Sequence, residues 1–187
     1  MSAGKLIVLS GPSGVGKSTV IKAMRERKKD FYFSISATTR PPRGSEQDGV
    51  AYYFVDREHF MDLIRDNQLL EWAEYSGECY GTPAAPIRRA RAEGQDVLLD
   101  IDLQGGLQVK ASEPDAILIF LLPPSMEELE SRLRGRGDTV NVEQRLERGR
   151  AECEQAPDFY DYLFVNDQVP RVVDSIFKVL EQESAAD

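Results

Sequence analysis

The stretch that decides the fold stands near the start of the chain: Leu6-Ile7-Val8-Leu9-Ser10-Gly11-Pro12-Ser13-Gly14-Val15-Gly16-Lys17-Ser18. It fits the pattern Gly-x-x-x-x-Gly-Lys-Ser/Thr, with an apolar strand before it and a helix-forming segment, residues 19–28, after it. Glycines let the backbone turn sharply, so that its N–H groups converge on an anion. The stretch predicts a cradle for the phosphates of a nucleoside triphosphate.

The residues of this cradle have separate expected roles. Lys17 neutralises the β- and γ-phosphates, Ser18 holds Mg²⁺, and the helix N-terminus adds its partial positive charge. The rest of the predicted triphosphate-binding loop consists of Gly11, Pro12, Ser13, Gly14, Val15, Gly16 and Thr19.

The composition is that of a soluble globular protein. The 187 residues are 41% hydrophobic and 29% charged, which is enough for one sizeable core. No apolar run is long enough to cross a bilayer, and the first one is already the strand before the cradle, so we expect no secretory signal. Cys79 and Cys153 lack metal-ligand spacing. We therefore expect reduced thiols and a cytoplasmic location.

Charge is unevenly distributed along the chain. The net charge of −9 argues against a nucleic acid as partner. The arginines nevertheless cluster, and this combination favours a small phosphorylated ligand. The clusters are Arg40 with Arg43, and Arg132, Arg134, Arg136, Arg145, Arg148 and Arg150.

The alternation of strands and helices predicts an α/β fold with a buried parallel sheet. The expected strands are residues 5–10, 96–101, 116–122 and 162–165, with 32–35 as a further candidate, and the expected helices are residues 17–28, 104–111, 125–134 and 169–183.

Two insertions interrupt this alternation. Residues 36–91 contain short alternating segments, 52–55 and 69–75, and a helix over 57–67 with Asp56 as its cap, which predicts a small mixed α+β lobe. Residues 132–157 are polar and poor in core-forming residues, which predicts a helical arm over solvent or ligand.

A second group of candidate ligands lies in the inserted lobe. Arg40 and Arg43 flank two prolines, and guanidinium groups on a stiff loop suit bidentate binding of a phosphate. Other hydrogen-bonding groups follow along the chain: Tyr52, Glu71, Tyr80, Thr82, Asp100 and Asp102.

With these residues in view, the chain resembles the guanylate kinase family over nearly its whole length. The matching segments occur in family order: residues 11–19, 36–43, Asp48-Gly49, Tyr52, Phe54, Glu71-Trp72, residues 80–82, residues 100–105, residues 134–137, Arg145-Leu146 and Asn166-Asp167. Together they are far more specific than the glycine-rich loop alone.

The resemblance implies transfer of the γ-phosphoryl group of Mg-ATP to GMP, giving ADP and GDP, in purine nucleotide metabolism and GMP recycling. It implies a parallel sheet flanked by helices, a GMP-binding lobe and a helical lid that close over the substrates. The corresponding boundaries are residues 1–35, 92–131 and 158–187 for the core, 36–91 for the lobe and 132–157 for the lid. ATP and GMP, with dGMP as a further acceptor, are the expected partners, without nucleic acid or membrane.

Carried over residue by residue, the resemblance assigns a role to each site. Guanine is expected to face Ser36, Glu71, Thr82 and Asp102. The GMP phosphate is expected to contact Arg40, Arg43, Tyr52 and Tyr80. Asn166 and Asp167 are expected near the adenine, and the catalytic set is Lys17, Arg43, Arg134, Arg136 and Arg145.

The base assignment has an independent chemical reason. Guanine presents N1–H and the N2 amino group along one edge, so the carboxylate of Glu71 can accept from both. Adenine has no proton on N1 and leaves that carboxylate unpaired, which costs several kcal/mol. Asp100, at the end of a buried strand, is expected to orient a water on Mg²⁺.

No general base is expected. The attacking group is a phosphate oxygen whose second pKa is about 6, so it is mostly deprotonated at neutral pH. Catalysis is then alignment and charge neutralisation by Lys17, Mg²⁺ and the arginines.

Three alternatives stay open from the sequence. The arginines of residues 132–157 could form a solvated helix face paired with Glu143, Glu147 and Glu152. The chain could be a related module that binds phosphorylated peptides, although such modules usually lack an intact cradle. It could also be a small kinase for another phosphorylated acceptor. The sequence leaves the oligomeric state open.

Overall fold

The computed structural model describes residues 3–75, 77–135 and 141–185. The chain divides into two compact units. The first consists of Met1–Val8 and Phe31–Ile117, and the second of Leu9–Asp30 and Leu118–Asp187. The expected division into core, lobe and lid stays a prediction.

Two sheets organise the strands. The larger has the strand order β2-β7-β1-β8-β9, and the smaller has the order β4-β3-β6-β5. In the larger sheet, β2 pairs in parallel with β7, and β8 pairs in parallel with β9. Its strands are β1 (Leu6–Ser10), β2 (Tyr32–Phe33), β7 (Val97–Asp100), β8 (Ile117–Leu122) and β9 (Tyr162–Val165). The α/β fold expected from the sequence is therefore confirmed.

The buried strands explain the apolar runs in the sequence. Every residue of β1 is buried, and β8 is buried over all but its last residue. Strands of a parallel sheet are covered on both faces, which is why these segments read as continuous apolar runs without alternation.

The smaller sheet belongs to the first unit. Its strands are β3 (Ala37–Thr38), β4 (Tyr53–Phe54), β5 (Leu69–Tyr75) and β6 (Glu78–Pro83). A small core of Ala37, Phe60 and Cys79 lies between this sheet and α2 (Arg57–Arg65). The side chain of Asp56 accepts a hydrogen bond from the His59 N–H at 2.7 Å, so the predicted helix cap is confirmed.

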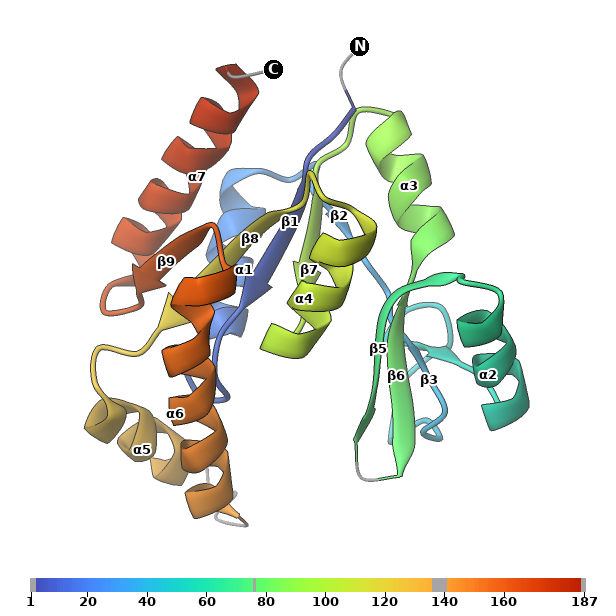
Figure 1. Ribbon diagram of the computed structural model, residues 1–187, viewed down its shortest axis with the longest axis horizontal. Coiled ribbons are helices and arrows are strands. Elements are labelled where there is room, and N and C mark those ends of the chain that lie inside the picture. Colours follow the sequence, from blue (N-terminus) through green and yellow to red (C-terminus); the bar gives the residue numbers. More distant parts are fainter. Residues whose placement is uncertain (1–2, 76, 136–140, 186–187) are drawn as a thin grey trace. The chain divides into compact units, whose positions relative to one another are not determined.

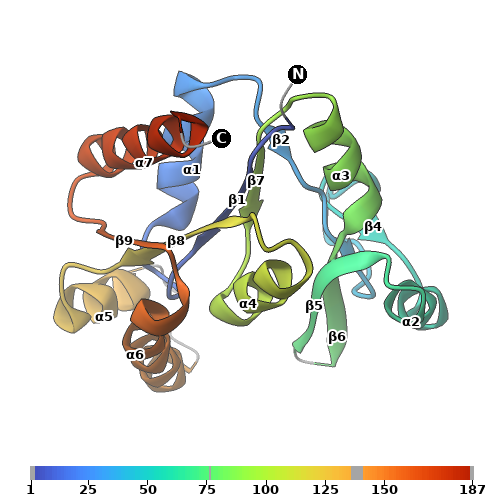
Figure 2. The same cartoon turned by 45° about the horizontal axis from the view of Figure 1, so that its top comes forward.

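Two further helices complete the first unit. They are α3 (Ala84–Ala92) and α4 (Leu103–Ser112), and α4 lies beside β5 in both ribbon views (Figures 1 and 2). Strand β6 and helix α3 were not among the elements expected from the sequence. The buried face of α3 consists of Ala84, Ile87 and Ala90, and two alanines give only a weak apolar signal.

The second unit holds four helices among its described residues. They are α1 (Lys17–Arg27), α5 (Met126–Gly135), α6 (Val142–Phe159) and α7 (Val169–Ala185). Helices α1 and α7 lie side by side (Figure 1). Arg27 of α1 pairs with Asp174 of α7 at 2.5 Å. Helix α5 begins where expected, because the Ser125 hydroxyl accepts the Glu128 N–H at 3.1 Å.

Helix α6 covers much of the segment 132–157, for which the sequence predicts a helical arm over solvent or ligand that is poor in core-forming residues. It packs against α5, and its buried residues Val142, Gly149 and Ala156 recur every seven positions. Small side chains let the two helices approach closely, and a search for large apolar residues overlooks such a stripe. None of the helices within the described ranges is long and apolar enough to span a membrane.

Candidate functional site

The glycine-rich loop joins β1 to α1 in the second unit. Gly14 and Gly16 have φ values of 90° and 103°, a region that side chains disfavour, so these positions require glycine. Gly16 caps α1 without a side-chain hydrogen bond, and the first turn of α1 holds no acidic residue. The positive end of the helix dipole therefore stays available to an anion.

Asn166 holds the loop from the end of β9. Its Nδ2 donates to the carbonyl of Val15 at 2.8 Å, and the residue is 4% exposed. A Cβ at Gly16 would stand 2.7 Å from this Nδ2, so the contact also depends on glycine. The Oδ1 atom of Asn166 is buried without a hydrogen-bond partner among the described residues. Asn166, expected near adenine, is thus a support of the loop in this structure.

Two arginines contact the loop from α5 and α6. Arg145, one of the expected lid arginines, donates from Nη2 to the Ser13 hydroxyl at 2.7 Å. Arg132 donates from Nη1 to the carbonyl of Val15 at 3.0 Å. Sequence reasoning did not nominate Arg132. Its position three residues after the buried Leu129 was an available signal, because that spacing puts both on one face of α5.

Arg134, another expected lid arginine, forms its hydrogen bonds with glutamates of α5 and α6. Arg134 pairs with Glu130 at 2.8 Å and with Glu143 at 3.4 Å, and it is exposed. Arg136 lies outside the described residues. Arg148 pairs with Glu152 at 2.8 Å, as the solvated-face alternative expects. The alternative therefore describes Arg134 and Arg148, whereas Arg145 contacts the loop.

In the first unit, three expected phosphate ligands meet. The Arg40 guanidinium carbon lies 5.4 Å from the centre of the Tyr52 ring, and the Tyr52 and Tyr80 rings are 6.2 Å apart. Tyr80 also hydrogen-bonds to Arg40. Arg40 is only 7% exposed, and its guanidinium carbon also lies 5.9 Å from the centre of the Phe54 ring, so a buried cation lies over two aromatic rings.

Glu46, which sequence reasoning missed, holds this arginine in place. Its Oε1 accepts from Arg40 Nη2 at 3.0 Å, and its Oε2 lies 3.0 Å from Arg40 Nη1. The same Oε2 accepts the backbone N–H of Arg43 at 2.8 Å. The hydrogen bond from Arg40 holds the pKa of Glu46 below its ordinary value. One carboxylate thus organises the loop that carries both predicted phosphate-binding arginines.

The expected base ligands also lie together. Glu71 on β5 is paired in register with Thr82 on β6, and the Thr82 hydroxyl donates to Glu71 Oε1 at 2.5 Å. Asp102 caps α4 by accepting the Gly105 N–H on its Oδ1 at 2.8 Å. It is close enough to Glu71 to affect its charge. Tyr80 and Thr82 lie two residues apart and share one face of β6, which links the base and phosphate ligands.

Burial dominates the electrostatics of Glu71. The residue is 8% exposed, and burial, with a smaller contribution from the negative charge of Asp102, raises its pKa from 4.5 to about 7. The hydrogen bond from Thr82 acts in the opposite direction. A carboxylate that is costly to ionise in a folded protein is typical of a binding or catalytic site.

Three further expected ligands, Ser36, Asp100 and Asp167, lie outside these two groups of side chains. The carbonyl of Ser36 accepts the Tyr53 N–H at 2.9 Å, and Asp100 is exposed at the end of β7. Asp167 accepts from the N–H of Gln168 and from Arg171. No group of three His, Cys, Asp or Glu side chains that could hold a metal occurs within the described ranges.

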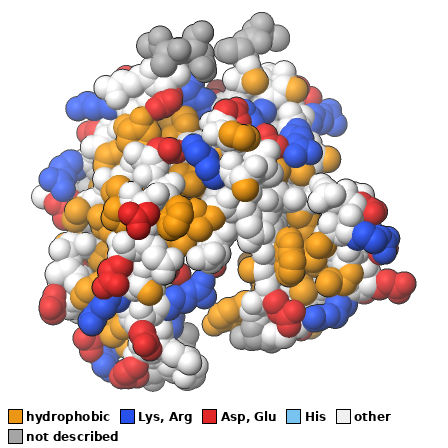
Figure 3. All heavy atoms as spheres, in the orientation of Figure 1, with side chains coloured by type: hydrophobic (Ala, Val, Ile, Leu, Met, Phe, Trp, Pro, Cys, Tyr) orange, Lys and Arg blue, Asp and Glu red, His pale blue; other side chains and the backbone are white. Residues whose placement is uncertain are grey.

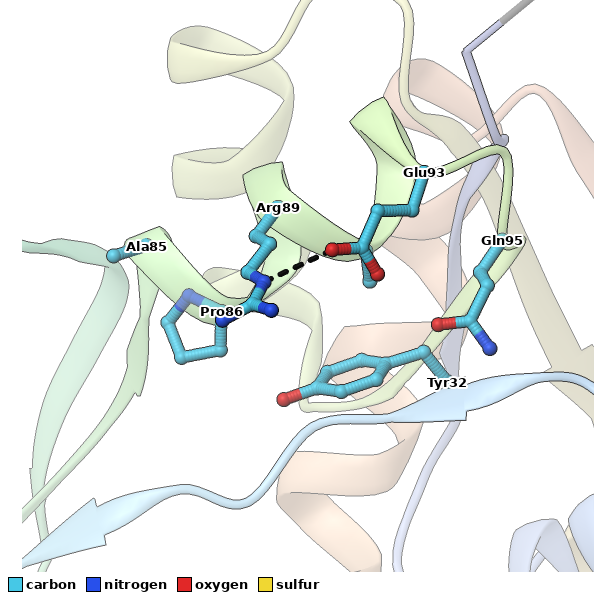
Figure 4. A pocket seen from close by; sticks show the side chains of 7 residues that line it. Tyr32, Ala85, Pro86, Arg89, Glu93 and Gln95 are labelled. Carbon is cyan, nitrogen blue, oxygen red and sulfur yellow. Dashed lines mark hydrogen bonds and ion pairs between the residues drawn. The ribbon is translucent and has the colours of Figure 1, made fainter.

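A separate cavity lies between α3 and Tyr32 (Figure 4). Its volume is about 480 Å³, and it contains none of the expected ligands. Its charged side chains, Arg89 and Glu93, are hydrogen-bonded to each other at 2.9 Å. The lining residues are Tyr32, Ala85, Pro86, Arg89, Ala90, Glu93 and Gln95. With its charges paired, this cavity offers no site for a phosphate.

Apolar side chains are exposed on the smaller sheet. Trp72 and Tyr75 are 39% and 65% exposed, and Figure 3 shows hydrophobic side chains on the surface of this part of the molecule. Both belong to β5, the edge strand that carries Glu71.

Comparison with known proteins shows the family of the chain. The model of the guanylate kinase family matches residues 3–183. The chain belongs to the guanylate kinase family. It is 50% identical over 182 residues to a guanylate kinase from Thermobifida fusca, covering 96% of this chain and 92% of that protein.

Other members of the guanylate kinase family are also similar to the chain over most of its length. A guanylate kinase from Synechococcus is 49% identical over 179 residues, which cover 95% of this chain and 82% of that protein. The crystal structure of guanylate kinase from Anaplasma phagocytophilum superimposes with a TM-score of 0.75 at 34% sequence identity, covering 98% and 87% of the two chains.

Proposed function

We propose that this chain transfers the γ-phosphoryl group of ATP to GMP, giving ADP and GDP, and so serves purine nucleotide metabolism and GMP recycling. The observation that carries the proposal is the pairing of buried Glu71 with Thr82, next to Asp102. Only a base with hydrogen-bond donors along its edge satisfies such acceptors, and guanine has two. Membership of the guanylate kinase family supports the same acceptor.

On the donor side, the loop of residues 11–19 binds the triphosphate of ATP. Its backbone N–H groups and the start of α1 bind phosphate oxygens, and Lys17 neutralises charge on the β- and γ-phosphates. Arg145 and Arg132 contribute positive charge next to this loop. The reacting phosphoryl group then has cations on several sides.

On the acceptor side, Arg40, Arg43, Tyr52 and Tyr80 bind the GMP phosphate. Guanidinium groups suit a phosphate dianion, and the phenol rings restrict where Arg40 can go. Glu46 reduces the entropy lost on binding because it already fixes the arginine loop. The guanine base faces Ser36, Glu71, Thr82 and Asp102, and dGMP fits the same ligands.

The Mg²⁺ that accompanies ATP requires hard oxygen ligands. The Ser18 hydroxyl at the start of α1 and the exposed Asp100 carboxylate, acting through water, have the right chemistry. When bound, the ion neutralises charge on the β- and γ-phosphates. Both thiols of the chain, at Cys79 and Cys153, are free, which is consistent with the cytoplasmic location that we propose.

No residue needs to remove a proton. The GMP phosphate is largely deprotonated at neutral pH because its second pKa is about 6. The residues therefore act by aligning two phosphates and by neutralising charge. We assign no general base.

An acceptor screen tests the proposal. ADP release with ATP is measured across GMP, dGMP, AMP, dTMP and ribose phosphates, and GMP is expected to be the preferred acceptor. A preference for any other acceptor would refute the assignment to guanine.

A lysine variant tests the donor side. Lys17→Ala is expected to lower turnover by about a hundredfold or more, while GMP binding measured without ATP stays near the wild-type value. Unchanged turnover would remove the role of the loop. If GMP binds to the wild-type chain without any turnover, the chain is a binding module instead of an enzyme.

A further inference from the structure

Helix α4 carries a glycine that its backbone does not require. Gly105 lies in the first turn of α4, it is buried, and its φ is not positive. Glycine destabilises a helix relative to alanine, so an ordinary helix position would favour alanine here. The reason for glycine must then lie in the surroundings of the helix.

The space beside Gly105 is taken by the carboxylate of Glu71. A Cβ at Gly105 would stand 3.1 Å from Glu71 Oε2. It would also stand 3.3 Å from Ile101 Cβ and 3.4 Å from Asp102 Oδ1. The contact with Glu71 is tighter than carbon and oxygen atoms normally allow, and the crowded atoms include both acidic ligands assigned to guanine.

Helix α4 cannot easily move away from β5 to make room. Gln108, one turn further along α4, hydrogen-bonds both backbone groups of Trp72, the neighbour of Glu71. Its Oε1 accepts the Trp72 N–H at 3.1 Å, and its Nε2 donates to the Trp72 carbonyl at 3.0 Å. These bonds fix the distance between helix and strand at the point where Gly105 meets Glu71.

Glu71 cannot move freely in the other direction either. Its Oε1 accepts the hydroxyl of Thr82 at 2.5 Å, and the residue is buried. An added methyl group at Gly105 must therefore turn the carboxylate of Glu71 or break one of these hydrogen bonds.

We infer that Gly105 is a positioning residue for guanine recognition: its missing side chain leaves the space in which the Glu71 carboxylate faces the base, while Gln108 holds α4 at the required distance. This inference rests on the proposed function, because it takes Glu71 as the guanine ligand. It adds the backbone of Gly105 to the residues that shape the base site.

The variant Gly105→Ala tests the inference. The KM for GMP is expected to rise about tenfold or more, while kcat at saturating GMP changes little, because the phosphate ligands and the ATP loop are untouched. GMP binding measured without ATP is expected to weaken by the same factor. The preference for GMP over IMP, which lacks the N2 amino group, is expected to shrink.

Melting temperature separates this role from a structural one. If Gly105 were only a helix residue, alanine would raise the melting temperature and leave the KM for GMP unchanged. Ser112→Ala, at the far end of α4, is the matched control and is expected to keep the wild-type KM. A folded Gly105→Ala variant with a KM for GMP within about twofold of wild type would overturn the inference.

A double variant tests the fixed distance between α4 and β5 in a second way. In Gly105→Ala/Gln108→Ala the two hydrogen bonds to Trp72 are gone, so α4 can move back and part of the GMP affinity is expected to return. Failure of the double variant to bind GMP better than Gly105→Ala would contradict the fixed distance that the inference requires.

The proposed function and this inference can fail separately. If Glu71→Gln leaves the KM for GMP unchanged, the assignment of Glu71 to guanine is wrong, and the proposed base site fails. If Glu71→Gln weakens GMP binding and Gly105→Ala does not, only the role of Gly105 fails.

Discussion

The carboxylate of Glu71 has two conflicting requirements. It must be charged to accept hydrogen bonds from guanine, and yet it is buried. Its pKa of about 7 means that it is largely protonated in slightly acidic solution. A protonated carboxyl group has one acceptor fewer and carries a donor that guanine N1–H opposes. The nearby Asp102 makes its ionisation harder still.

The activity should therefore depend on pH through Glu71. We expect kcat/KM for GMP to fall as the pH drops below about 7, towards tenfold per unit, because only the charged form binds guanine well. In Glu71→Gln, kcat/KM for GMP should not show this fall below pH 7. The GMP phosphate also titrates near pH 6 and affects both proteins equally. The contribution of Glu71 is therefore the difference between the pH profiles of kcat/KM for wild type and Glu71→Gln. Superimposable profile shapes would contradict the assignment.

The same group should limit stability. The pKa of Glu71 is raised from 4.5 to about 7 in the folded state, so folding loses stability as the pH rises through that interval. The shift corresponds to on the order of 3 kcal/mol at 1.36 kcal/mol per unit. Thermal unfolding of Glu71→Gln is expected to show a gain over wild type near pH 8 and little gain near pH 5. An equal gain in stability at pH 5 and pH 8 would show that the buried charge of Glu71 does not destabilise the wild-type protein.

Glu46 offers a second test at single-residue scale. Glu46→Ala removes the carboxylate that holds Arg40 and the Arg43 N–H, and we expect the KM for GMP to rise about tenfold with little change in kcat. Glu46→Gln can keep part of the hydrogen bonding and should have a smaller effect. Glu74→Ala, which breaks the exposed ion pair with Arg57, is the control. Equal effects of the Glu46 and Glu74 variants would rule out a specific role for Glu46.

At the scale of elements, α6 places two arginines in different surroundings, a difference that the sequence does not show. Arg145 reaches Ser13 in the loop, whereas Arg148 pairs with Glu152 on its own helix. The two arginines occur in the same polar segment and have the same charge. The orientation of α6, which packs against α5 and buries Val142, Gly149 and Ala156, decides which one faces the loop.

This separation predicts unequal effects of two matched variants. Arg145→Ala is expected to lower kcat about a hundredfold, because a cation next to the reacting phosphates is lost. Arg148→Ala should stay within about threefold of wild type, since an exposed ion pair contributes little. Steady-state kinetics at saturating ATP and GMP decides this. Comparable losses in both variants would show that α6 does not present Arg145 selectively.

The elements also show where prediction from sequence stops. The loop between β1 and α1 and the long apolar strands were predictable, because glycine geometry and burial leave local patterns. Strand β6 was not, because Glu78–Pro83 lacks clear alternation and depends on pairing with β5 and β3. Helix α3 was missed because its buried face is mostly alanine.

Candidate ligands were easier to predict than the residues that position them. Glu71 and Arg40 have a chemical type that suggests a role. Glu46, Gly105 and Gln108 act through contacts between segments far apart in sequence or through the absence of a side chain, and neither leaves a local signal.

At the scale of the whole molecule, the proposed reaction requires two nucleotides to meet. The ATP loop belongs to the second unit and the GMP ligands to the first. We expect the radius of gyration from small-angle scattering to decrease when GMP and a non-hydrolysable ATP analogue are both bound, because one phosphoryl group must contact ligands from both units. Identical scattering curves with and without the two nucleotides would contradict this expectation.

The two hydrogen bonds from Gln108 to Trp72 have a consequence for solubility. Strand β5 is the edge of the smaller sheet and carries exposed Trp72 and Tyr75. An open edge of this kind can recruit a strand from another molecule and start aggregation. Because the Gln108 amide occupies both outward backbone groups of Trp72, it blocks intermolecular strand pairing at the middle of this edge.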